Sequence, residues 1–372
     1  MNERAKRILE WSKKKKAGPY LIEIWPTNRC NLRCIMCGTW NNREKLEKMG
    51  IKYDPKSEIK MEVSEERLLK LVDEANELNA KEFLITGGGE PFVRKSTTLK
   101  LIKKIKEYGM FGNINTNGSL LTKSDIDKIV KTGWDMIMFS VDGPDAKTHD
   151  FIRGVRGTFQ KVKTALQEIK KLKKKYRQDK PKVVFNTVLT NKIFDKIDKL
   201  ILFASEMGVS DITFIPLIVY SEKMKSIELN KKQKMKIKAK IQELIKLSEK
   251  LDVNTNLPWL EFFKTDQMNE VILNEIKNSP RDIIHSPCYE PFLHLLIKGN
   301  GETTFCCMIE NSPENIKEKS LKKIWFGKYF NLQRRNFINK KIREECKFCV
   351  FSQYSKNKEI RDLINLEMQD NK

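Results

Sequence analysis

The chain has no run of about 18 apolar residues, so no segment is long enough to cross a membrane as a helix. A secretory leader is also missing, because Met1–Lys16 is charged and contains no apolar stretch followed by a cleavage site. Histidine is scarce, with 3 in 372 residues, and none of the three has the spacing of a metal-binding pair. These absences predict a cytoplasmic protein that does not insert into membranes.

Cysteine is absent between residues 38 and 287, although the chain has 8. A cytoplasmic compartment keeps thiols reduced, so disulfides are not expected. Clustered cysteines separated by a long cysteine-free stretch indicate ligands of a metal or of an iron–sulfur cluster. The first group is Cys30, Cys34 and Cys37, and the second is Cys288, Cys306, Cys307, Cys346 and Cys349.

Acidic residues are too few to balance the basic ones. The chain carries 72 Lys+Arg and 49 Asp+Glu, a formal net charge of +23, and 40% of its residues are hydrophobic. The hydrophobic fraction is sufficient for a packed core, which excludes wholesale disorder. The charge permits a nucleic-acid partner but does not favour one. None of the known RNA-module patterns is present, and the lysine run at Lys170–Arg177 continues an amphipathic helix.

Short apolar runs alternate with helical patterns from about residue 19 to 225. Each run is bounded by turn residues or charges, and a segment of helical periodicity follows it. In the first such segment, Ser64 is the expected N-cap of a helix whose apolar stripe includes Leu68 and Val72. Six βα repeats predict an α/β fold with a parallel sheet, either doubly wound or curved into a partial barrel. The expected strands are Tyr20–Trp25, Glu82–Thr86, Gly112–Asn115, Met136–Val141, Val183–Leu189 and Ile212–Pro216.

The pattern changes twice after the βα region. From about 226 it is helical and lysine-rich, which predicts a connector and not a seventh βα repeat. From 285 it predicts a β-hairpin, with arms Phe292–Ile297 and Thr303–Cys306 around Gly299–Gly301, and then a short helix and a cysteine-rich end. The last residues predict a peripheral helix or a frayed tail. The expected divisions are 1–18 (N-terminal helical extension), 19–225 (βα region), 226–284 (helical connector), 285–355 (small C-terminal α+β domain) and 356–372 (charged tail).

The first three cysteines lie in the loop that directly follows the first expected strand. Three residues separate Cys30 from Cys34, and two separate Cys34 from Cys37. Three thiolates can hold three irons of a [4Fe–4S] cluster and leave the fourth iron open, whereas a structural cluster normally uses four cysteines. An open iron can bind a substrate or cofactor directly. The alternative is a zinc site completed by a distant fourth ligand.

This cysteine spacing after the first strand of a βα series resembles that of the radical S-adenosylmethionine (radical SAM) enzymes. The resemblance covers nearly the whole chain and implies a partial (βα)6 barrel. It also implies a [4Fe–4S] cluster whose open iron binds the amino and carboxylate groups of S-adenosylmethionine (SAM). Reduction of that cluster cleaves SAM to a 5′-deoxyadenosyl radical, which takes a hydrogen atom from the substrate. An electron donor such as flavodoxin or ferredoxin is the expected partner.

Further residues match the family and imply where SAM binds. Gly88-Gly89-Glu90 resembles the motif that receives the methionine amino group, and Ser140 stands where the family often has a ribose-contacting hydroxyl. Arg153 resembles an arginine that meets the methionine carboxylate. Met36 replaces the aromatic residue that often packs by the adenine, and a thioether can also pack on a ring. Without the family, each of these features has another explanation. Gly88-Gly89-Glu90 is then a turn, Ser140 a hydroxyl hydrogen-bonded to nearby backbone, and Arg153 one partner of a surface ion pair.

The second cysteine group can close around another metal centre. Cys288, Cys306, Cys346 and Cys349 come from the hairpin, its arm and a terminal CxxC. A zinc site with four cysteine ligands would have the same spacing. Strand alternation sends adjacent side chains to opposite faces, so we take Cys306 as the ligand in preference to Cys307. Cys307 is then a buried small residue, an alternative ligand or a proton acceptor near the substrate.

The region 285–355 resembles the twitch domain, a shortened relative of the SPASM domain. The resemblance implies one auxiliary [4Fe–4S] cluster held by four cysteines. Radical proteins with this tail resemble carbinol or sugar dehydrogenases and peptide-modifying maturases. The predicted function is therefore hydrogen abstraction from a peptide or a sugar/carbinol small molecule. The auxiliary cluster accepts an electron, which gives a two-electron oxidation or a related modification.

The sequence does not identify the general base or the substrate. Substrate contacts are expected at strand ends near Asn186, Pro216 and Tyr220. Two other functions stay open. An RNA- or tRNA-modifying radical enzyme is motivated by the net charge and would bind tRNA in a salt-sensitive manner. A non-enzymatic zinc or iron–sulfur scaffold would not cleave SAM at all, and the three-cysteine loop with its open site counts against it.

Overall fold

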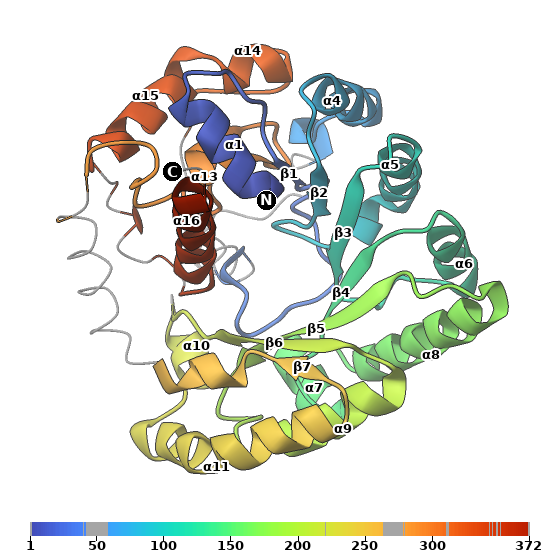
Figure 1. Cartoon of the computed structure of the whole chain (residues 1–372). Coiled ribbons are helices and arrows are strands. Elements are labelled where there is room, and N and C mark those ends of the chain that lie inside the picture. The colour runs from blue at the N-terminus through green and yellow to red at the C-terminus, as the bar shows by residue number, and fades with distance from the viewer. Residues whose placement is uncertain are drawn as a thin grey trace. The chain divides into compact units, whose positions relative to one another are not determined.

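The structure, a computed structural model, describes residues 2–39, 41, 59–219, 221–262, 278, 280–309, 312–341, 343, 345–346, 349 and 351–370. The chain forms two compact units, whose elements are labelled in Figure 1. The larger unit comprises Trp25–Glu62 and Ile85–Phe263. The smaller unit comprises Met1–Ile24, Val63–Leu84 and Lys264–Lys372, so both ends of the chain belong to it.

The larger unit is built on parallel strands. Its strands are β3 (Phe111–Thr116), β4 (Met136–Ser140), β5 (Lys182–Leu189), β6 (Asp211–Pro216) and β7 (Asn254–Thr255), and β2 (Glu82–Ile85) crosses the boundary between the units. Each strand from β3 to β7 pairs in parallel with the next. Parallel neighbours need a crossover connection, and the chain supplies helices between them. The predicted α/β class with a parallel sheet is confirmed.

Helices lie along the outer side of these strands (Figure 1). The helices of the larger unit are η1 (Pro91–Arg94), α5 (Lys95–Glu107), α6 (Lys123–Lys131), α7 (Ala146–Arg153), α8 (Thr158–Tyr176), α9 (Ile197–Met207), α10 (Glu222–Lys225), α11 (Lys231–Lys250) and η2 (Leu257–Phe262). In β4, Ile137 and Phe139 are buried, whereas Met138 and Ser140 on the opposite face are half-buried. This period of two separates a helix-covered face from an inner face.

The connector after β6 differs from the prediction in one respect. Helix α11 is the expected lysine-rich helix, with Ile237, Ile241 and Leu244 buried. It is followed by β7, whose two residues pair in parallel with β6. The sequence did not indicate this strand, because two residues are too short to produce a periodic signal. Part of the expected connector, residues 263–277, lies outside the described residues.

The smaller unit contains both parallel and antiparallel strand pairing. Its elements are α1 (Glu3–Ser12), β1 (Leu21–Ile24), α4 (Glu65–Glu77), α13 (Glu290–Leu293), β8 (His294–Ile297), β9 (Thr303–Thr304), α14 (Leu321–Trp325), α15 (Lys328–Ile338) and α16 (Phe351–Asp370). Strand β8 pairs in parallel with β1 and antiparallel with β9. The hairpin is thus present, but Phe292 belongs to the helix α13 and Cys306 lies beyond the end of β9. Ser64 caps α4, as predicted.

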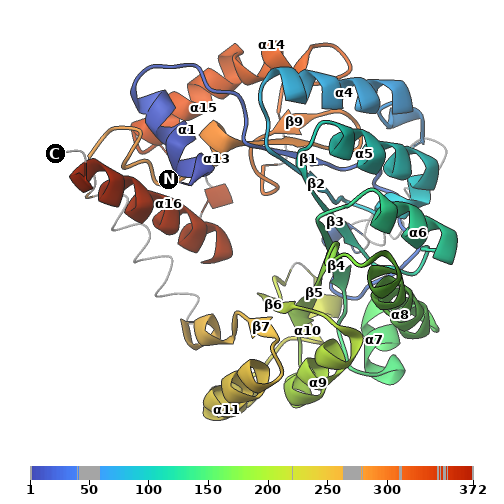
Figure 2. The ribbon, with the colours of Figure 1, turned by 45° about the vertical axis from the view of Figure 1, so that its right-hand side comes forward.

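A hydrophobic core joins the two ends of the chain inside the smaller unit. Ile8 of α1 packs in one cluster with Phe292 of α13 and with Ile360 and Ile364 of α16. Figures 1 and 2 both place α1 and α16 side by side. The spacing of four residues puts Ile360 and Ile364 on one face of α16. The C-terminal segment is therefore a packed helix and not a frayed tail.

A buried group of three charges links β1, β8 and α13. His294 Nδ1 lies 2.6 Å from Glu290 Oε2, and His294 Nε2 lies 3.2 Å from Glu23 Oε2. Burial alone would lower the pKa of His294, but hydrogen bonds and charges from the two carboxylates outweigh it and raise that pKa to about 10. Burial would raise the pKa of Glu290, but His294 outweighs it, and the pKa is lowered to about 2. His294 is therefore a buried cation held between two carboxylates.

These shifts predict how the H294Q variant depends on pH. A raised histidine pKa stabilises the fold below the ordinary value of 6.5, and this contribution is lost as the pH rises towards 10. A lowered glutamate pKa stabilises the fold above 4.5, and this contribution is lost as the pH falls towards 2. We expect the loss of unfolding free energy in H294Q to be largest between pH 4.5 and 6.5.

Urea unfolding of wild type and H294Q over a pH series measures this loss. The matched control is H285Q, because the more exposed His285 pairs only at the surface with Asp282. A loss in H294Q that stays constant up to pH 10 would show that His294 is not charged in the folded protein.

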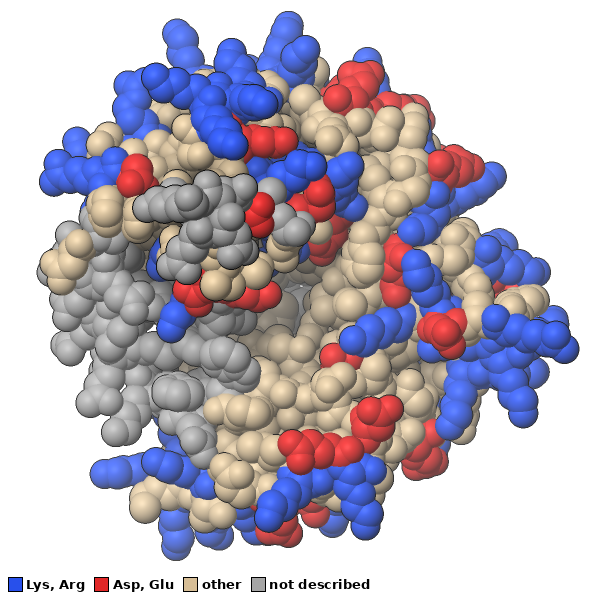
Figure 3. Space-filling view, viewed as in Figure 1, with Lys and Arg blue, Asp and Glu red and all other residues tan. Residues whose placement is uncertain are grey.

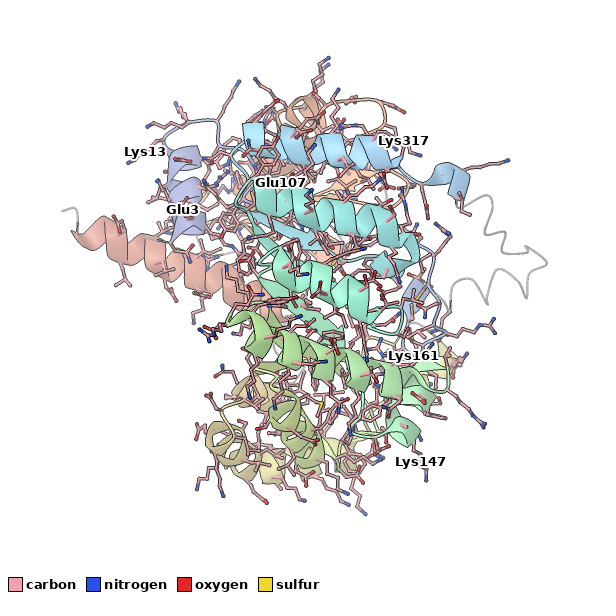
Figure 4. The ribbon with its side chains drawn as sticks, turned by 90° about the vertical axis from the view of Figure 1, so that its right-hand side faces the viewer. Glu3, Lys13, Glu107, Lys147, Lys161 and Lys317 are labelled. Carbon is pink, nitrogen blue, oxygen red and sulfur yellow. The ribbon has the colours of Figure 1, made fainter. Side chains whose placement is uncertain are left out.

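Basic side chains are scattered over the surface. On the face seen in Figure 3, Lys and Arg are interspersed with Asp and Glu and do not form one continuous patch. Figure 4 shows the labelled Lys147 of α7, Lys161 of α8 and Glu107 of α5 on the outside of the ribbon. This distribution fits solvated helix faces. Among the described residues, no helix is long and apolar enough to cross a membrane.

Candidate active site

A cavity of about 230 Å³ lies in the larger unit at the carboxyl ends of β3 and β4. Parallel strands present their carboxyl-end loops at one edge, so residues far apart in sequence meet there. All three cysteines of the first group line it, as do Met36, Gly88-Gly89-Glu90, Ser140 and Arg153. The structure therefore brings together every SAM-site residue that the sequence singled out. The other lining residues are Leu32, Thr39, Thr86, Gly87, Asn115, Thr116 and Asn117.

The cysteine loop is held by the end of α7. The backbone N–H groups of Arg33 and Ile35 donate to the carbonyl oxygens of Arg153 and Ile152, at 3.2 and 2.9 Å. These carbonyls are free to accept because the last turn of a helix has no further N–H partners of its own. Gly154 ends α7 with φ +72°, and a Cβ there would lie 2.2 Å from Arg33 O. The close approach of helix end and loop therefore requires glycine at this position.

The glycines at 88 and 89 bring a second loop against the cysteine loop. A Cβ on Gly89 would lie 2.1 Å from the carbonyl oxygen of Arg29, and one on Gly88 would lie 2.6 Å from Asn28 Oδ1. The next N–H, that of Glu90, donates to Arg29 O at 2.9 Å. Glycine in a ligand-binding loop often lets the backbone approach the ligand closely. The Cβ positions of Gly88 and Gly89 instead face the protein, so their first role is to pack the two loops together.

The G89A variant is accordingly expected to displace the cysteine loop, because its methyl group overlaps a backbone oxygen that cannot rotate away. We expect a loss of about 1–3 kcal/mol in unfolding free energy and a lower iron content per chain after anaerobic reconstitution. The control G109A has no atom within 4 Å of its Cβ. It should cost only ~1–2 kcal/mol of backbone strain at positive φ and keep full iron. Full iron in G89A would contradict this role of Gly89.

Glu90 is more constrained than the sequence suggested. Its carboxylate is buried and accepts three hydrogen bonds, from the N–H groups of Phe92 and Asn117 and from Thr116 Oγ1. Burial raises the pKa of Glu90, although these hydrogen bonds and the charge of Arg153 oppose the rise. Two carboxylate oxygens offer about four lone-pair positions, so about one is left for a further donor. An ammonium group in the cavity is a suitable donor for it.

Arg153 is a buried ion-pair partner and not a surface residue. Its Nη2 lies 2.6 Å from Asp142 Oδ2, and its Nη1 lies 3.8 Å from Cys34 Sγ. Its Nε is buried without a hydrogen-bond partner in the described part of the chain. An orphaned N–H on a guanidinium that lines a cavity suits an incoming carboxylate. The alternative of a surface ion pair is wrong, because Arg153 is only 8% exposed.

The thiols suit metal ligation better than nucleophilic catalysis. Burial raises the pKa of Cys34 to about 12 and also raises that of Cys30, although the charge of Arg153 opposes both shifts. A thiol with a raised pKa is protonated at neutral pH and is a poor nucleophile, whereas a bound metal removes its proton. The described residues of the cavity lining include one cation, Arg153, and one acid, Glu90. Three thiols beside these groups fit an iron–sulfur cluster and a zwitterionic ligand.

A row of uncharged polar side chains continues from the cavity along the inner face of the sheet. Ser140 of β4 pairs in register with Asn186 of β5, and Asn186 pairs with Thr213 of β6. We call these three residues the inner row. Asn186 Nδ2 donates only to the weak acceptor Met138 Sδ, at 3.7 Å, and Ser140 Oγ lies 3.4 Å from Asn115 Oδ1. The inner row thus offers donors and acceptors to a ligand. Tyr220, also expected near the substrate, lies outside the described residues.

The second cysteine group lies in the smaller unit. Burial raises the pKa values of Cys288, Cys346 and Cys349, with Cys349 at about 12. Cys349 N–H donates to Cys346 O at 3.1 Å. Charge interactions connect Cys288 with Cys346 and Cys349, and Cys306 with Cys288. The described residues contain no three His, Cys, Asp or Glu side chains grouped tightly enough for a single metal ion.

The argument that separated Cys306 from Cys307 does not hold. Both residues follow β9 and lie in a turn, in which Ile309 N–H donates to Cys306 O at 3.2 Å. The two thiols are hydrogen-bonded to each other, which raises the pKa of Cys306 and lowers that of Cys307. Strand alternation does not apply in a turn, so both sulfurs face the same region. Cys307 is exposed, and the prediction that it is a buried small residue is wrong.

Comparison with known families matches both cysteine groups. The model of the Radical SAM superfamily matches residues 24–227, which is more than half of the chain. The SPASM model, an iron-sulfur cluster-binding domain, matches residues 288–350. The two matched segments contain the first and second cysteine groups, respectively. An iron–sulfur domain at the second group supports iron over zinc there.

Individual relatives have low sequence identity to this chain, and the share of the chain that they match varies. A tungsten-containing aldehyde ferredoxin oxidoreductase cofactor-modifying protein of Pyrococcus furiosus is 25% identical over 349 residues, 87% of each chain. A PqqA peptide cyclase of Granulibacter bethesdensis is 34% identical over 144 residues, 39% of this chain and 34% of the relative. The crystal structure of Streptococcus suis SuiB bound to S-adenosylmethionine has a TM-score of 0.63 at 18% identity, covering 90% of this chain and 70% of that one. The last likeness shows a shared fold.

Proposed function

Because the chain belongs to the radical SAM superfamily, we propose that it oxidises an uncharged peptide or a sugar/carbinol small molecule by two electrons. The observation that carries this proposal is the single cavity in which three thiols, a glycine loop, a carboxylate and a guanidinium meet. Membership of the superfamily makes the chain an enzyme that uses SAM and a [4Fe–4S] cluster. The non-enzymatic scaffold is thereby excluded.

We assign the residues of the cavity as follows. Cys30, Cys34 and Cys37 would hold the reactive cluster and leave one iron open, since the lining contains no fourth cysteine. The free lone-pair position of Glu90 would accept from the methionine ammonium. The unpaired Nε of Arg153 would donate to the methionine carboxylate. Met36 and Ser140 line the same cavity and would contact the adenosine part, with Met36 packed on the base.

The overall reaction balances as an oxidation of the substrate. Cleavage of SAM uses one electron from an external donor of the flavodoxin or ferredoxin class, and it supplies the group that removes one hydrogen atom from the substrate. Methionine and 5′-deoxyadenosine leave. A cluster at the second site would supply a one-electron acceptor, so that loss of one proton from the substrate radical to a base would complete a two-electron oxidation and leave a new double bond or ring. Cys288, Cys306, Cys346 and Cys349 would hold that cluster, with Cys307 as the alternative to Cys306.

The inner row supports an uncharged substrate. Ser140, Asn186 and Thr213 present hydroxyl and carboxamide groups, which pair with amides and hydroxyls. An RNA substrate would need cations for its phosphates, and among the described residues Arg153 is the only cation in the cavity lining. The similarity to a peptide cyclase over part of the chain supports the peptide option. RNA modification is therefore the weaker candidate.

The proposed function is tested with the reconstituted, dithionite-reduced enzyme and SAM under anaerobic conditions. Peptide and small-molecule fractions of source cells are added separately, and a portion of the peptide fraction is first digested with protease. We expect one fraction to increase 5′-deoxyadenosine formation and to yield a product that has lost two hydrogen atoms by mass spectrometry. Stimulation by total tRNA alone, without any such product, would overturn the proposal.

A further inference from the structure

We propose that Asp142 is a positioning residue for the reactive cluster and for SAM, and that it acts through Arg153. Asp142 follows β4, is fully buried and does not line the cavity. The proposal rests on the function proposed above, because it concerns how the cofactors of that function are held.

Asp142 is fixed on three sides. Its Oδ1 accepts from the backbone N–H of Val188 on β5 at 2.7 Å. Its own backbone N–H donates to Nδ1 of His149 on α7 at 3.3 Å. Its Oδ2 lies 2.6 Å from Arg153 Nη2. A carboxylate that is bonded to the strand on one side and to the helix on the other has little freedom to rotate, so it defines where the guanidinium lies.

Arg153 conveys this position to the cofactor site. With Nη2 paired to Asp142, the planar guanidinium places Nη1 3.8 Å from Cys34 Sγ and leaves Nε without a partner in the described part of the chain. A hydrogen bond to a cysteine sulfur changes the reduction potential of the cluster that it holds. The unpaired Nε is left as a donor for the carboxylate that we propose SAM to place there. Asp142 therefore determines two interactions of Arg153, the one with Cys34 Sγ and the one proposed with the SAM carboxylate.

The Asn variant separates positioning from catalysis. In D142N, one amide oxygen can still accept from Val188 N–H, but the NH₂ group then faces Nη2 of Arg153, and two donors repel. We expect the guanidinium to leave its place, although the side chains assigned to SAM are all still present. These are Met36, Glu90, Ser140 and Arg153. We expect SAM affinity to fall by about 10- to 100-fold and the midpoint potential of the reactive cluster to shift.

The measurements are isothermal titration with SAM on the oxidised, reconstituted enzyme and a redox titration followed by electron paramagnetic resonance. D135N is the matched control. Asp135 is also a buried, ion-paired aspartate at an end of β4, but it pairs with Lys106 and Lys180 and does not line the cavity. D135N should lose comparable stability and keep both the SAM affinity and the potential.

A double-mutant cycle decides whether Asp142 acts through Arg153. We expect D142N to change neither SAM affinity nor potential further when it is combined with R153Q. In the double variant neither Asp142 nor Arg153 is left as the unpaired charge of a broken pair, so it keeps the test open where D142N alone does not fold. Full additivity of the two changes, or an unchanged SAM affinity in D142N, would overturn the proposal. Failure of the proposed function is distinguishable, because wild type would then still bind SAM but would form no product that has lost two hydrogen atoms.

Discussion

The C34A variant is expected to lose all formation of 5′-deoxyadenosine. Cys34 is the most deeply buried of the three cavity cysteines and lies beside Arg153, so no solvent-exposed ligand can replace it. Removing one of three ligands should leave the cluster unassembled and lower the iron content by about four per chain. Anaerobic reconstitution, iron analysis and chromatography of the SAM products measure both effects.

C307A is the control for this change. Cys307 is an exposed cysteine of the other group, so its loss removes a thiol without touching the cavity. We expect C307A to form 5′-deoxyadenosine at the wild-type rate. Persistent SAM cleavage in a folded C34A protein would remove Cys34 from the set of cluster ligands.

The second large effect is expected from C288A and C346A, singly or together. Both cysteines lie in the smaller unit and in the segment matched by the iron–sulfur domain model. Without them the auxiliary cluster has no complete ligand set, and the iron content falls by about four per chain. The substrate radical then lacks its electron acceptor. We therefore expect oxidised product to disappear while 5′-deoxyadenosine still forms.

Together, the predictions for C34A and for C288A and C346A distinguish the roles of the two clusters. C34A should stop both products, whereas C288A and C346A should stop only the oxidised one. Near-ultraviolet circular dichroism of each variant shows whether the fold is retained. An undiminished yield of oxidised product from a folded variant that lacks the second cluster would exclude the electron-acceptor role and favour a redox-neutral reaction.

Much of the fold was predictable because the βα repeats are long and regular. The six expected strands agree with the structure to within about two residues, and Ser64 and Gly208 mark helix ends as their chemistry predicts. The features that the sequence did not predict are short or depend on contacts between residues far apart in the chain. Strand β7 has two residues, and β8 pairs with β1 across more than 250 positions, which periodicity cannot reveal. The packing of α16 on α1 is likewise invisible in local sequence.

The candidate site was predictable where spacing carries the signal. The cysteine triplet, the glycine loop, Ser140 and Arg153 are recognisable by motif, and all of them line one cavity. Asp142 was overlooked because an acid after a strand has many roles, and its partner Arg153 is 11 residues away on another element. The charge group of Glu23, Glu290 and His294 was missed because it forms only when β1 and β8 pair.

The central claim is that the chain holds two [4Fe–4S] clusters, one of which has an open iron that binds SAM. The most direct test is anaerobic analysis of iron and zinc, together with electron paramagnetic resonance of the dithionite-reduced protein before and after addition of SAM. We predict about eight irons per chain, little zinc, and one of two cluster signals changed by SAM. Zinc alone, with no response to SAM after careful reconstitution, would contradict the account.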